Sequence, residues 1–186
     1  MQRCGWVSQD PLYIEYHDRE WGIPQTDSKA LFAMLCLEGQ QAGLSWITVL
    51  KKRENYRRAF HDFDPQAVAL MSEEDIDALM QDSGLIRHRG KLSAIVVNAR
   101  AYLAMEASGE KFDHFIWSFV DHQPQINHLQ SLADAQSKTD VSDAMSKALK
   151  KRGFKFVGST ICYAFMQACG LVNDHVVDCF CHPDNL

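Results

Sequence analysis

The sequence lacks the features that mark membrane and repeat proteins. No apolar run reaches the roughly 18 residues that a membrane-spanning helix requires, and the N-terminus carries no apolar signal segment. Internal repeats and low-complexity tracts are also missing. We therefore expect a cytoplasmic protein that makes no membrane contact.

An excess of positive charge is missing as well. The chain has 24 acidic and 19 basic residues, which gives a net charge of −5. A protein that binds nucleic acid over its whole surface has a positive net charge. Any affinity for DNA must therefore be local. The 186 residues, 46% of them hydrophobic, suffice for one sizeable core or two small lobes that share an interface.

Alternating strand patterns are almost absent, and apolar residues recur at helical spacing, which predicts an all-α protein. Capping residues predict helix starts at Ser28, Ser45 and Ser72. The polar stretch 123–140 has no periodicity and is interpreted as a connection between lobes. The expected helices cover residues 28–38, 45–53, 72–84, 92–103, 112–120, 143–151 and 159–169.

Two pairs of residues at opposite ends of the chain contain the ligand types of a zinc site. Cys4 and His17 lie near the N-terminus, and His175 and Cys179 are spaced so that one helical turn would point both the same way. Two Cys and two His suit tetrahedral Zn²⁺. The spacing of the first pair is not that of a zinc finger, so buried apolar thiols remain the alternative. A zinc ion here would be structural and would tie both termini together.

Glu38 stands out on its predicted helix. It follows Leu31 by seven positions and Leu35 by three, which puts a carboxylate on the face expected to be buried. Such burial costs free energy unless the group has a partner, so Glu38 is a candidate functional residue. The alternative is that Glu38 reaches solvent at a frayed helix end beside Gly39.

The segment 154–159 is predicted to be a tight hairpin between two helices, with Gly158 in a backbone conformation that other residues avoid. The free N–H groups of the helix that begins at Ser159 could bind a DNA phosphate, assisted by Lys151, Arg152 and Lys155. The alternative is a helical hairpin that serves only packing.

Several sequence blocks together resemble the helix-hairpin-helix DNA glycosylases, and within them the type I 3-methyladenine DNA glycosylases. The resemblance runs nearly end to end and implies a two-lobed helical fold. One lobe would span about 28–140, the hairpin lobe 142–170, and zinc would join the termini 1–27 and 171–186. The blocks are Arg3-Cys4-Gly5-Trp6, Tyr13, Tyr16-His17, Glu20-Trp21-Gly22, the run from Leu37 to Trp46, the hairpin, and Asn173-Asp174-His175.

The resemblance implies a role for each part of the site. Zn²⁺ is expected on the four residues named above, with Cys181 and His182 as competing ligands. Glu38 is expected to recognise the damaged base. Five aromatic residues are expected at a base pocket, of which Tyr16 and Trp46 would sandwich the base and Tyr13 would line the pocket; the other two, Trp6 and Trp21, are expected partly to pack the core.

The chain departs from the wider superfamily at three positions. The hairpin has Phe156 where a Gly is usual, so we expect a different turn. Asn173 takes the place of the usual catalytic Asp, and Asp174, one residue away, is not assigned that role. Thr160 stands where lyase chemistry needs a Lys, so no Schiff base is expected.

The implied activity is hydrolysis of the N-glycosidic bond of 3-methyladenine in alkylated double-stranded DNA, without a lyase step. Gly43 and Leu44 lie in a turn that could wedge into the duplex, although an ordinary hydrophobic loop contact is an equal alternative. The enzyme is expected to act as a monomer. The alternative function is a zinc-stapled DNA-binding module without catalysis.

Overall fold

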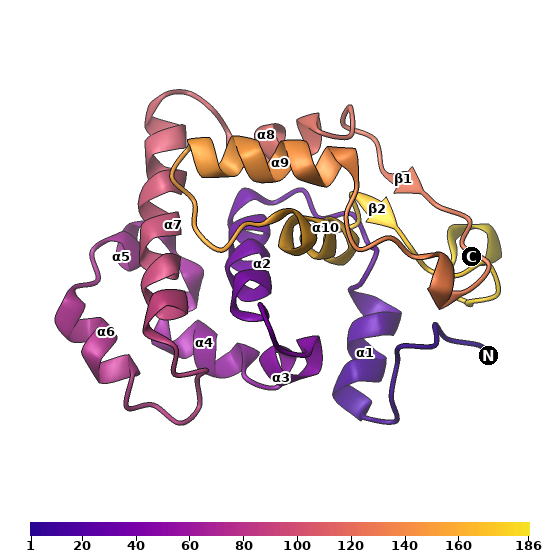
Figure 1. The fold of residues 1–186 in the computed structure, drawn as a ribbon, viewed down its shortest axis with the longest axis horizontal. Coiled ribbons are helices and arrows are strands. Elements are labelled where there is room, and N and C mark those ends of the chain that lie inside the picture. The colour runs from indigo at the N-terminus through magenta and orange to yellow at the C-terminus, as the bar shows by residue number, and fades with distance from the viewer.

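The computed structural model describes all 186 residues, and helices dominate it (Figure 1). The all-α prediction is confirmed, apart from one short parallel pair of strands, and no helix is both long and apolar enough to cross a bilayer. The elements are α1 (Pro11–Arg19), α2 (Ser28–Gln40), α3 (Trp46–Leu50), α4 (Arg53–Ala59), α5 (Pro65–Ala69), α6 (Glu73–Leu79), α7 (Arg89–Ala107), α8 (Phe112–Ser118), β1 (Gln125–Ile126), α9 (Asp140–Lys151), α10 (Ser159–Ala168) and β2 (Val172–Asn173), with short 3-10 turns at His61–Phe63, Leu132–Asp134 and Pro183–Asn185.

The helix starts follow the capping residues. The Asp27 side chain accepts a hydrogen bond from the backbone of Ala30, and Ser72 forms a reciprocal capping box with Asp75. Ser45 precedes α3 as expected, but its hydroxyl bonds to the Thr48 hydroxyl instead of capping the backbone. The single helix predicted over 45–53 is wrong, because the chain turns after Leu50 and starts α4, which brings Tyr56 into the core.

The main core is one continuous cluster of 36 buried residues that runs from Leu31 on α2 to Val172 on β2. Helix α2 lies at its centre, against α7 and α10 (Figure 1). On α7, Leu92, Ile95 and Ala99 have no exposed surface, as their helical spacing predicts. The division into two lobes stays a prediction, since this core extends through both of them.

The two termini lie on the same side of the molecule (Figure 1). The N–H of Phe180 donates to the carbonyl of Gln2 at 2.9 Å, and a second buried cluster joins Cys4 to Val176 and Cys179. In the strand pair, Gln125 lies opposite Val172. The segment 123–140 is thereby attached to the C-terminal segment instead of merely linking two lobes.

Candidate active site

A cavity of about 330 Å³ opens between α1, α2, α3 and α10. This volume falls at the lower end of the roughly 300–1,000 Å³ of small-molecule sites. Glu38 and all five predicted pocket aromatics line the cavity, so the fold brings together residues that span 40 positions of the sequence. These aromatics are Trp6, Tyr13, Tyr16, Trp21 and Trp46.

One wall of the cavity was not anticipated from the sequence. It comes from the polar segment 123–140, of which Leu129, Leu132, Ala135, Gln136 and Ser137 line the cavity. Backbone hydrogen bonds to distant residues hold this segment there, one from Val177 to Leu129 and one from Asn127 to Asn173. No local pattern in the sequence signals such long-range pairing.

Glu38 is buried on α2, with 4% of its surface exposed, and faces the cavity. The alternative that it reaches solvent is therefore wrong. Burial raises the pKa of its carboxyl group from 4.5 to about 8, and no hydrogen bond or cation offsets this effect. Most buried carboxylates in proteins are paired. An unpaired one at a cavity wall is a site prepared for a ligand that donates hydrogen bonds or carries positive charge.

The aromatic rings form adjoining walls around this carboxylate. The ring centroid of Trp6 lies 5.0 Å from that of Tyr13 and 5.0 Å from that of Trp21. Burial raises the pKa of the Tyr16 hydroxyl well above its usual value, and the negative charge of Glu38 raises it further. Trp6 and Trp21 also pack on the small cluster at the termini, as expected for residues with a partly structural role.

The arrangement of Tyr16 and Trp46 differs from the expected sandwich. Their ring centroids are 5.6 Å apart and their planes are inclined by 44°. A flat base between two parallel rings needs about 7 Å, since each carbon contact takes about 3.5 Å. In this structure the two rings therefore meet as neighbouring walls, and the sandwich stays a prediction.

Two hydrogen-bond donors in the cavity walls have no partner. They are the indole nitrogens of Trp6 and Trp46, and both atoms are buried. Leaving a buried donor unpaired costs about 1–3 kcal/mol, so such groups are rare in folded proteins. Both nitrogens belong to residues that line the cavity, as does the unpaired carboxyl group of Glu38.

Asp174 also lines the cavity but is fully engaged with the protein. Its carboxylate accepts hydrogen bonds from the Tyr163 hydroxyl, from Gln167 and from Asn127. Asn173, which occupies the place of the usual catalytic Asp, accepts from the backbone of His175 and points away toward Gly22. Neither residue presents a free group to a ligand.

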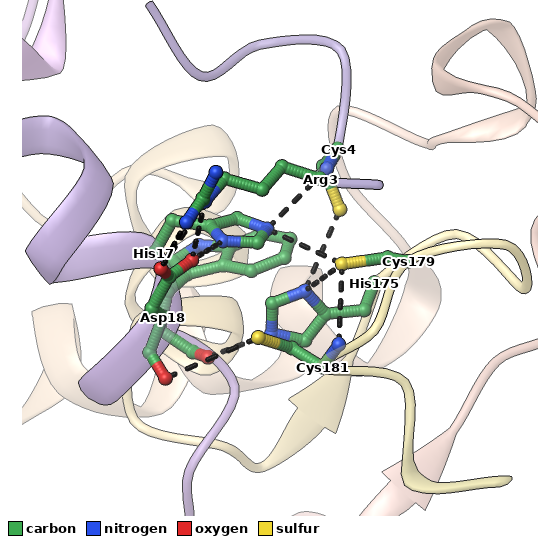
Figure 2. A network of polar contacts seen from close by, with 8 residues as sticks. Arg3, Cys4, His17, Asp18, His175, Cys179 and Cys181 are labelled. Carbon is green, nitrogen blue, oxygen red and sulfur yellow. Dashed lines mark hydrogen bonds and ion pairs between the residues drawn. The ribbon is translucent and has the colours of Figure 1, made fainter. Parts of the chain in front are cut away.

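The four predicted zinc ligands converge beside the cavity (Figure 2). The Nδ1 atom of His175 lies 3.4 Å from the sulfur of Cys4 and 3.5 Å from that of Cys179. The Cys179 sulfur is also 3.5 Å from Nε2 of His17. Tetrahedral zinc with bonds of about 2.3 Å to sulfur and 2.0–2.1 Å to nitrogen requires sulfur-to-nitrogen edges of about 3.6 Å. The four residues would therefore hold Zn²⁺ with little movement.

Neighbouring groups orient both imidazole rings toward the cluster (Figure 2). The Nδ1–H of His17 donates to Asp18 at 2.7 Å, and Arg3 in turn binds Asp18 through two nitrogens. The Nε2–H of His175 donates to the backbone carbonyl of Trp21 at 3.0 Å. In each ring the nitrogen that faces the thiols is thus free of hydrogen, as metal binding requires.

The competing ligands take other positions. The sulfur of Cys181 faces the carbonyl of Asp18, and both ring nitrogens of His182 are hydrogen-bonded, one to Asn127 and one to Asp184. The expectation that His175 and Cys179 share a helical turn is wrong, because residues 175–179 form a non-helical turn after β2.

The hairpin between α9 and α10 differs from the predicted geometry. Gly158 has an ordinary extended conformation, with φ −60° and ψ 164°, whereas Phe156 adopts the left-handed conformation with φ 55°. The prediction for Gly158 is therefore wrong. Phe156 takes the conformation usual for glycine, and the strain is offset because its ring packs near His88 and its backbone rests on Gly39.

The predicted DNA contacts are only partly available at the surface. Lys155 is exposed beside the start of α10, but Arg152 is bound to Glu110 by two hydrogen bonds of 2.8 Å and stacks on Phe115. The Ser159 hydroxyl is bonded to Ser142 and Asp143. The backbone N–H groups at the start of α10 and the exposed side chains of Lys151 and Lys155 therefore remain as candidates for binding a phosphate there.

The predicted wedge lies in the turn between α2 and α3. Gly43 adopts a φ of 78°, which favours glycine, and Leu44 is 38% exposed. The turn leads directly from Glu38 on α2 to Trp46 on α3. A loop that contacts the duplex here would thus lie next to the cavity.

Comparison with known proteins agrees with this geometry. The methyladenine glycosylase family model matches residues 6–182. DNA-3-methyladenine glycosylase 1 of Escherichia coli (strain K12) is 71% identical over 185 residues, which cover 100% of this chain and 99% of that protein. A crystal structure of a 3-methyladenine DNA glycosylase I is 70% identical and superimposes with a TM-score of 0.97, covering 98% of this chain and 100% of that one.

A more distant structure gives the same result. The 3-methyladenine DNA glycosylase I of Staphylococcus aureus, whose structure describes recognition of 3-methyladenine, is 44% identical. It superimposes with a TM-score of 0.95 over 98% of this chain and 97% of that one. The match in sequence and fold extends over the cavity and over both ends of the chain, and the protein therefore belongs to the methyladenine glycosylase family.

Proposed function

We propose that the enzyme releases 3-methyladenine from alkylated double-stranded DNA by hydrolysing the N-glycosidic bond, in base excision repair. One observation carries this proposal. The buried carboxylate of Glu38 faces a cavity walled by aromatic rings and has no protein partner. The names of the full-length relatives support the same substrate.

The aromatic walls suit a base that has left the duplex. A stacked base is inaccessible to an enzyme, so the target nucleotide must be flipped out, and the pocket must replace the lost stacking. Stacking on an aromatic side chain is worth about 1–3 kcal/mol per base. Methylation at N3 makes the base cationic, and the faces of Trp46 and Tyr16 attract such a ring further.

Glu38 sorts damaged bases from normal ones by charge. An ionised carboxylate attracts the cationic base and accepts hydrogen bonds from its exocyclic amine. An uncharged adenine lacks this attraction, so its binding does not offset the free-energy cost of a buried negative charge. With a pKa of about 8, the empty pocket holds Glu38 protonated at neutral pH. Entry of the cationic base favours the ionised form, so binding is accompanied by release of one proton.

The positive charge of the methylated base also explains why the glycosidic bond breaks. The methylated base carries a positive charge that the electrons of the broken C1′–N9 bond neutralise, so it leaves without protonation by an acid. Water supplies the hydroxyl at C1′ and gives its second proton to the solvent. The enzyme contributes extrusion, orientation and a fixed electrostatic environment. No Lys lines the cavity and Thr160 occupies the wall, which supports a reaction without a lyase step.

The proposed cofactor is one structural Zn²⁺ held by Cys4, His17, His175 and Cys179. All four tetrahedral positions would be filled by protein, so the ion stabilises the fold and binds no substrate. Burial raises the pKa of the Cys4 thiol to about 12 and lowers that of His175 to about 4. A cation bound between them would offset the cost of ionising the buried thiols, which supports a site built for metal.

Two elements of the structure are proposed to bind DNA. Lys155 and the backbone at Gly158 and Ser159 would bind a phosphate, and Gly43 and Leu44 would fill the gap left by the flipped base. A monomer would suffice, since one core spans the chain, and six unpaired thiols are in keeping with the reducing cytoplasm. A non-catalytic DNA-binding module is less well supported, because it has no use for an unpaired buried carboxylate.

The proposal is tested by incubating the protein with methylated duplex DNA and identifying the released bases by chromatography. We expect 3-methyladenine from the native protein and strongly reduced release from Glu38→Gln, with duplex binding nearly unchanged. Glu74→Gln, on the exposed start of α6, is the matched control. Equal release by Glu38→Gln and the native protein would contradict the role of Glu38.

A further inference from the structure

Helix α7 holds two separate surface loops through two buried polar side chains. Lys91 and Asn98 are 5% and 3% exposed and lie seven positions apart, on the same face of the helix. Two helical turns, about 10.5 Å, separate them along the axis. Each binds the backbone of one of the two proposed DNA-contacting elements.

Lys91 holds the turn that follows α2. Its ammonium donates to the carbonyl of Gln40, the last residue of α2, at 3.0 Å and to that of Ala42 at 2.6 Å. The arrangement is reciprocal, because the Gln40 side chain donates to the Lys91 carbonyl at 2.9 Å. The Tyr56 hydroxyl holds the other end of the Gln40 amide. The end of α2 at Gln40 and the turn at Ala42 are thus anchored to α7.

The use of a lysine at this position is costly. Burial lowers the pKa of Lys91, and no carboxylate pairs with its ammonium. The positive charge is favourable at the C-terminal end of α2, where carbonyl groups are free. The second carbonyl, that of Ala42, lies beyond the helix end in the turn itself. Packing alone would be met by Met or Leu, so the charge at Lys91 serves to hold the turn.

Asn98 holds the hairpin. Its side-chain oxygen accepts from the N–H of Lys155 at 2.8 Å, and its amide donates to the Lys155 carbonyl at 3.2 Å. Figure 1 shows the loop between α9 and α10 passing beside α7. Both backbone groups of the residue proposed to bind phosphate are therefore taken by one side chain of α7. Phe156, the next residue, packs on Gly39 and links the hairpin back to α2.

We propose that Lys91 and Asn98 are positioning residues that set the spacing between the wedge turn, residues 41–45, and the hairpin, residues 154–158, so that both engage one duplex. This inference rests on the proposed function, since it takes both elements as DNA contacts. Neither residue lines the base cavity. Their loss should therefore weaken duplex binding and leave binding of the free base intact.

The test compares two ligands, a duplex with a stable abasic-site analogue and free 3-methyladenine. Duplex affinity is measured by fluorescence anisotropy, and base affinity by quenching of the cavity tryptophans. We expect Lys91→Met to weaken duplex binding about tenfold, as loss of hydrogen bonds from a charged donor implies, with base affinity unchanged. Lys29→Met, which removes an exposed charge at the start of α2, is the control and should match the native protein.

Double-mutant cycles separate positioning from general stability. If Lys91 acts through Leu44, then Lys91→Met costs little further affinity in a Leu44→Ala background. In the same way Asn98→Ala should cost little once Lys155→Ala is present. The Asn98 cycle decides the proposal by itself if Lys91→Met does not fold.

Two outcomes would overturn the inference. One is additive losses in both cycles, and the other is an equal loss of affinity for the duplex and for the free base. Failure of the native protein to release 3-methyladenine would instead overturn the proposed function. The two failures are therefore distinguishable.

Discussion

Phe156 of the hairpin rests directly on Gly39, the residue that follows Glu38 on α2. A Cβ atom at position 39 would lie 3.1 Å from the Phe156 carbonyl oxygen and 3.2 Å from its Cβ. Contacts this close force either the hairpin or α2 to move. Glu38, proposed to recognise the base, and the proposed phosphate-binding hairpin are therefore connected through a single glycine.

Replacing Gly39 by Ala is expected to destabilise the protein by about 1–2 kcal/mol, because overpacking outweighs the gain in helix propensity. The free energy of unfolding from urea denaturation measures the effect. Gly158→Ala is the control, since its φ of −60° suits alanine and nothing lies within 4 Å of the added carbon. A loss at position 158 as large as that at 39 would contradict this account of the hairpin.

Glu38 is expected to make the protein less stable as the pH rises. Its pKa is about 8 in the folded protein and 4.5 ordinarily, so between these values the folded state keeps a proton that the unfolded chain has lost. The free energy of unfolding then falls with pH, by up to about 1.4 kcal/mol per pH unit from this group.

This slope is measured by urea denaturation between pH 5 and pH 8. Glu38→Gln cannot lose a proton, so it should match the native protein near pH 5 and exceed it in stability near pH 8. Parallel curves for the two proteins across this range would show that the pKa of Glu38 is not raised in the folded protein, and would contradict its burial without a partner.

Cys179→Ser is expected to abolish stoichiometric zinc binding, whereas Cys181→Ser should retain one zinc per chain by mass spectrometry of the metal. The sulfur of Cys179 contacts both imidazoles of the proposed site, while that of Cys181 faces the Asp18 carbonyl. Chelation should lower the melting temperature of the native protein and of the Cys181→Ser variant alike. Zinc retained by Cys179→Ser but lost from Cys181→Ser would show that Cys181, and not Cys179, is the zinc ligand.

Lys155→Ala and Arg152→Ala are expected to differ although both remove a positive charge near the hairpin. Loss of the exposed Lys155 should weaken duplex binding and reduce the salt slope of the binding constant by about one. Arg152 is occupied by Glu110, so its loss should lower stability and leave the salt slope unchanged. Titrations at several salt concentrations provide the measurement, and identical slopes for both variants would argue against this division.

Much of the site was predictable because several of its residues stand out within short stretches of the sequence. Glu38 is conspicuous as a carboxylate on an apolar helix face, and the structure buries it beside the predicted aromatic rings. The helix starts at Ser28 and Ser72 follow from capping chemistry, which involves only residues within one turn. The two Cys and two His residues could be listed as ligand types, although their spacing left buried thiols as an alternative.

Other features depend on contacts between residues far apart in the chain. The cavity wall formed by segment 123–140, the left-handed conformation of Phe156, and the engagement of Arg152 by Glu110 have no local signature. Each arises because packing of distant elements outweighs local preference.

The sequence by itself thus determined the helical class, the helix starts at Ser28 and Ser72 and the residue types proposed for the site, since these follow from periodicity and from side chains read one at a time. Only the tertiary structure decided which of those residues meet. It tilts Tyr16 against Trp46 where a sandwich was expected, and it brings Cys4 to within 3.4 Å of a nitrogen of His175. Distances between such remote residues result from the packing of the whole core, which no short stretch of sequence encodes.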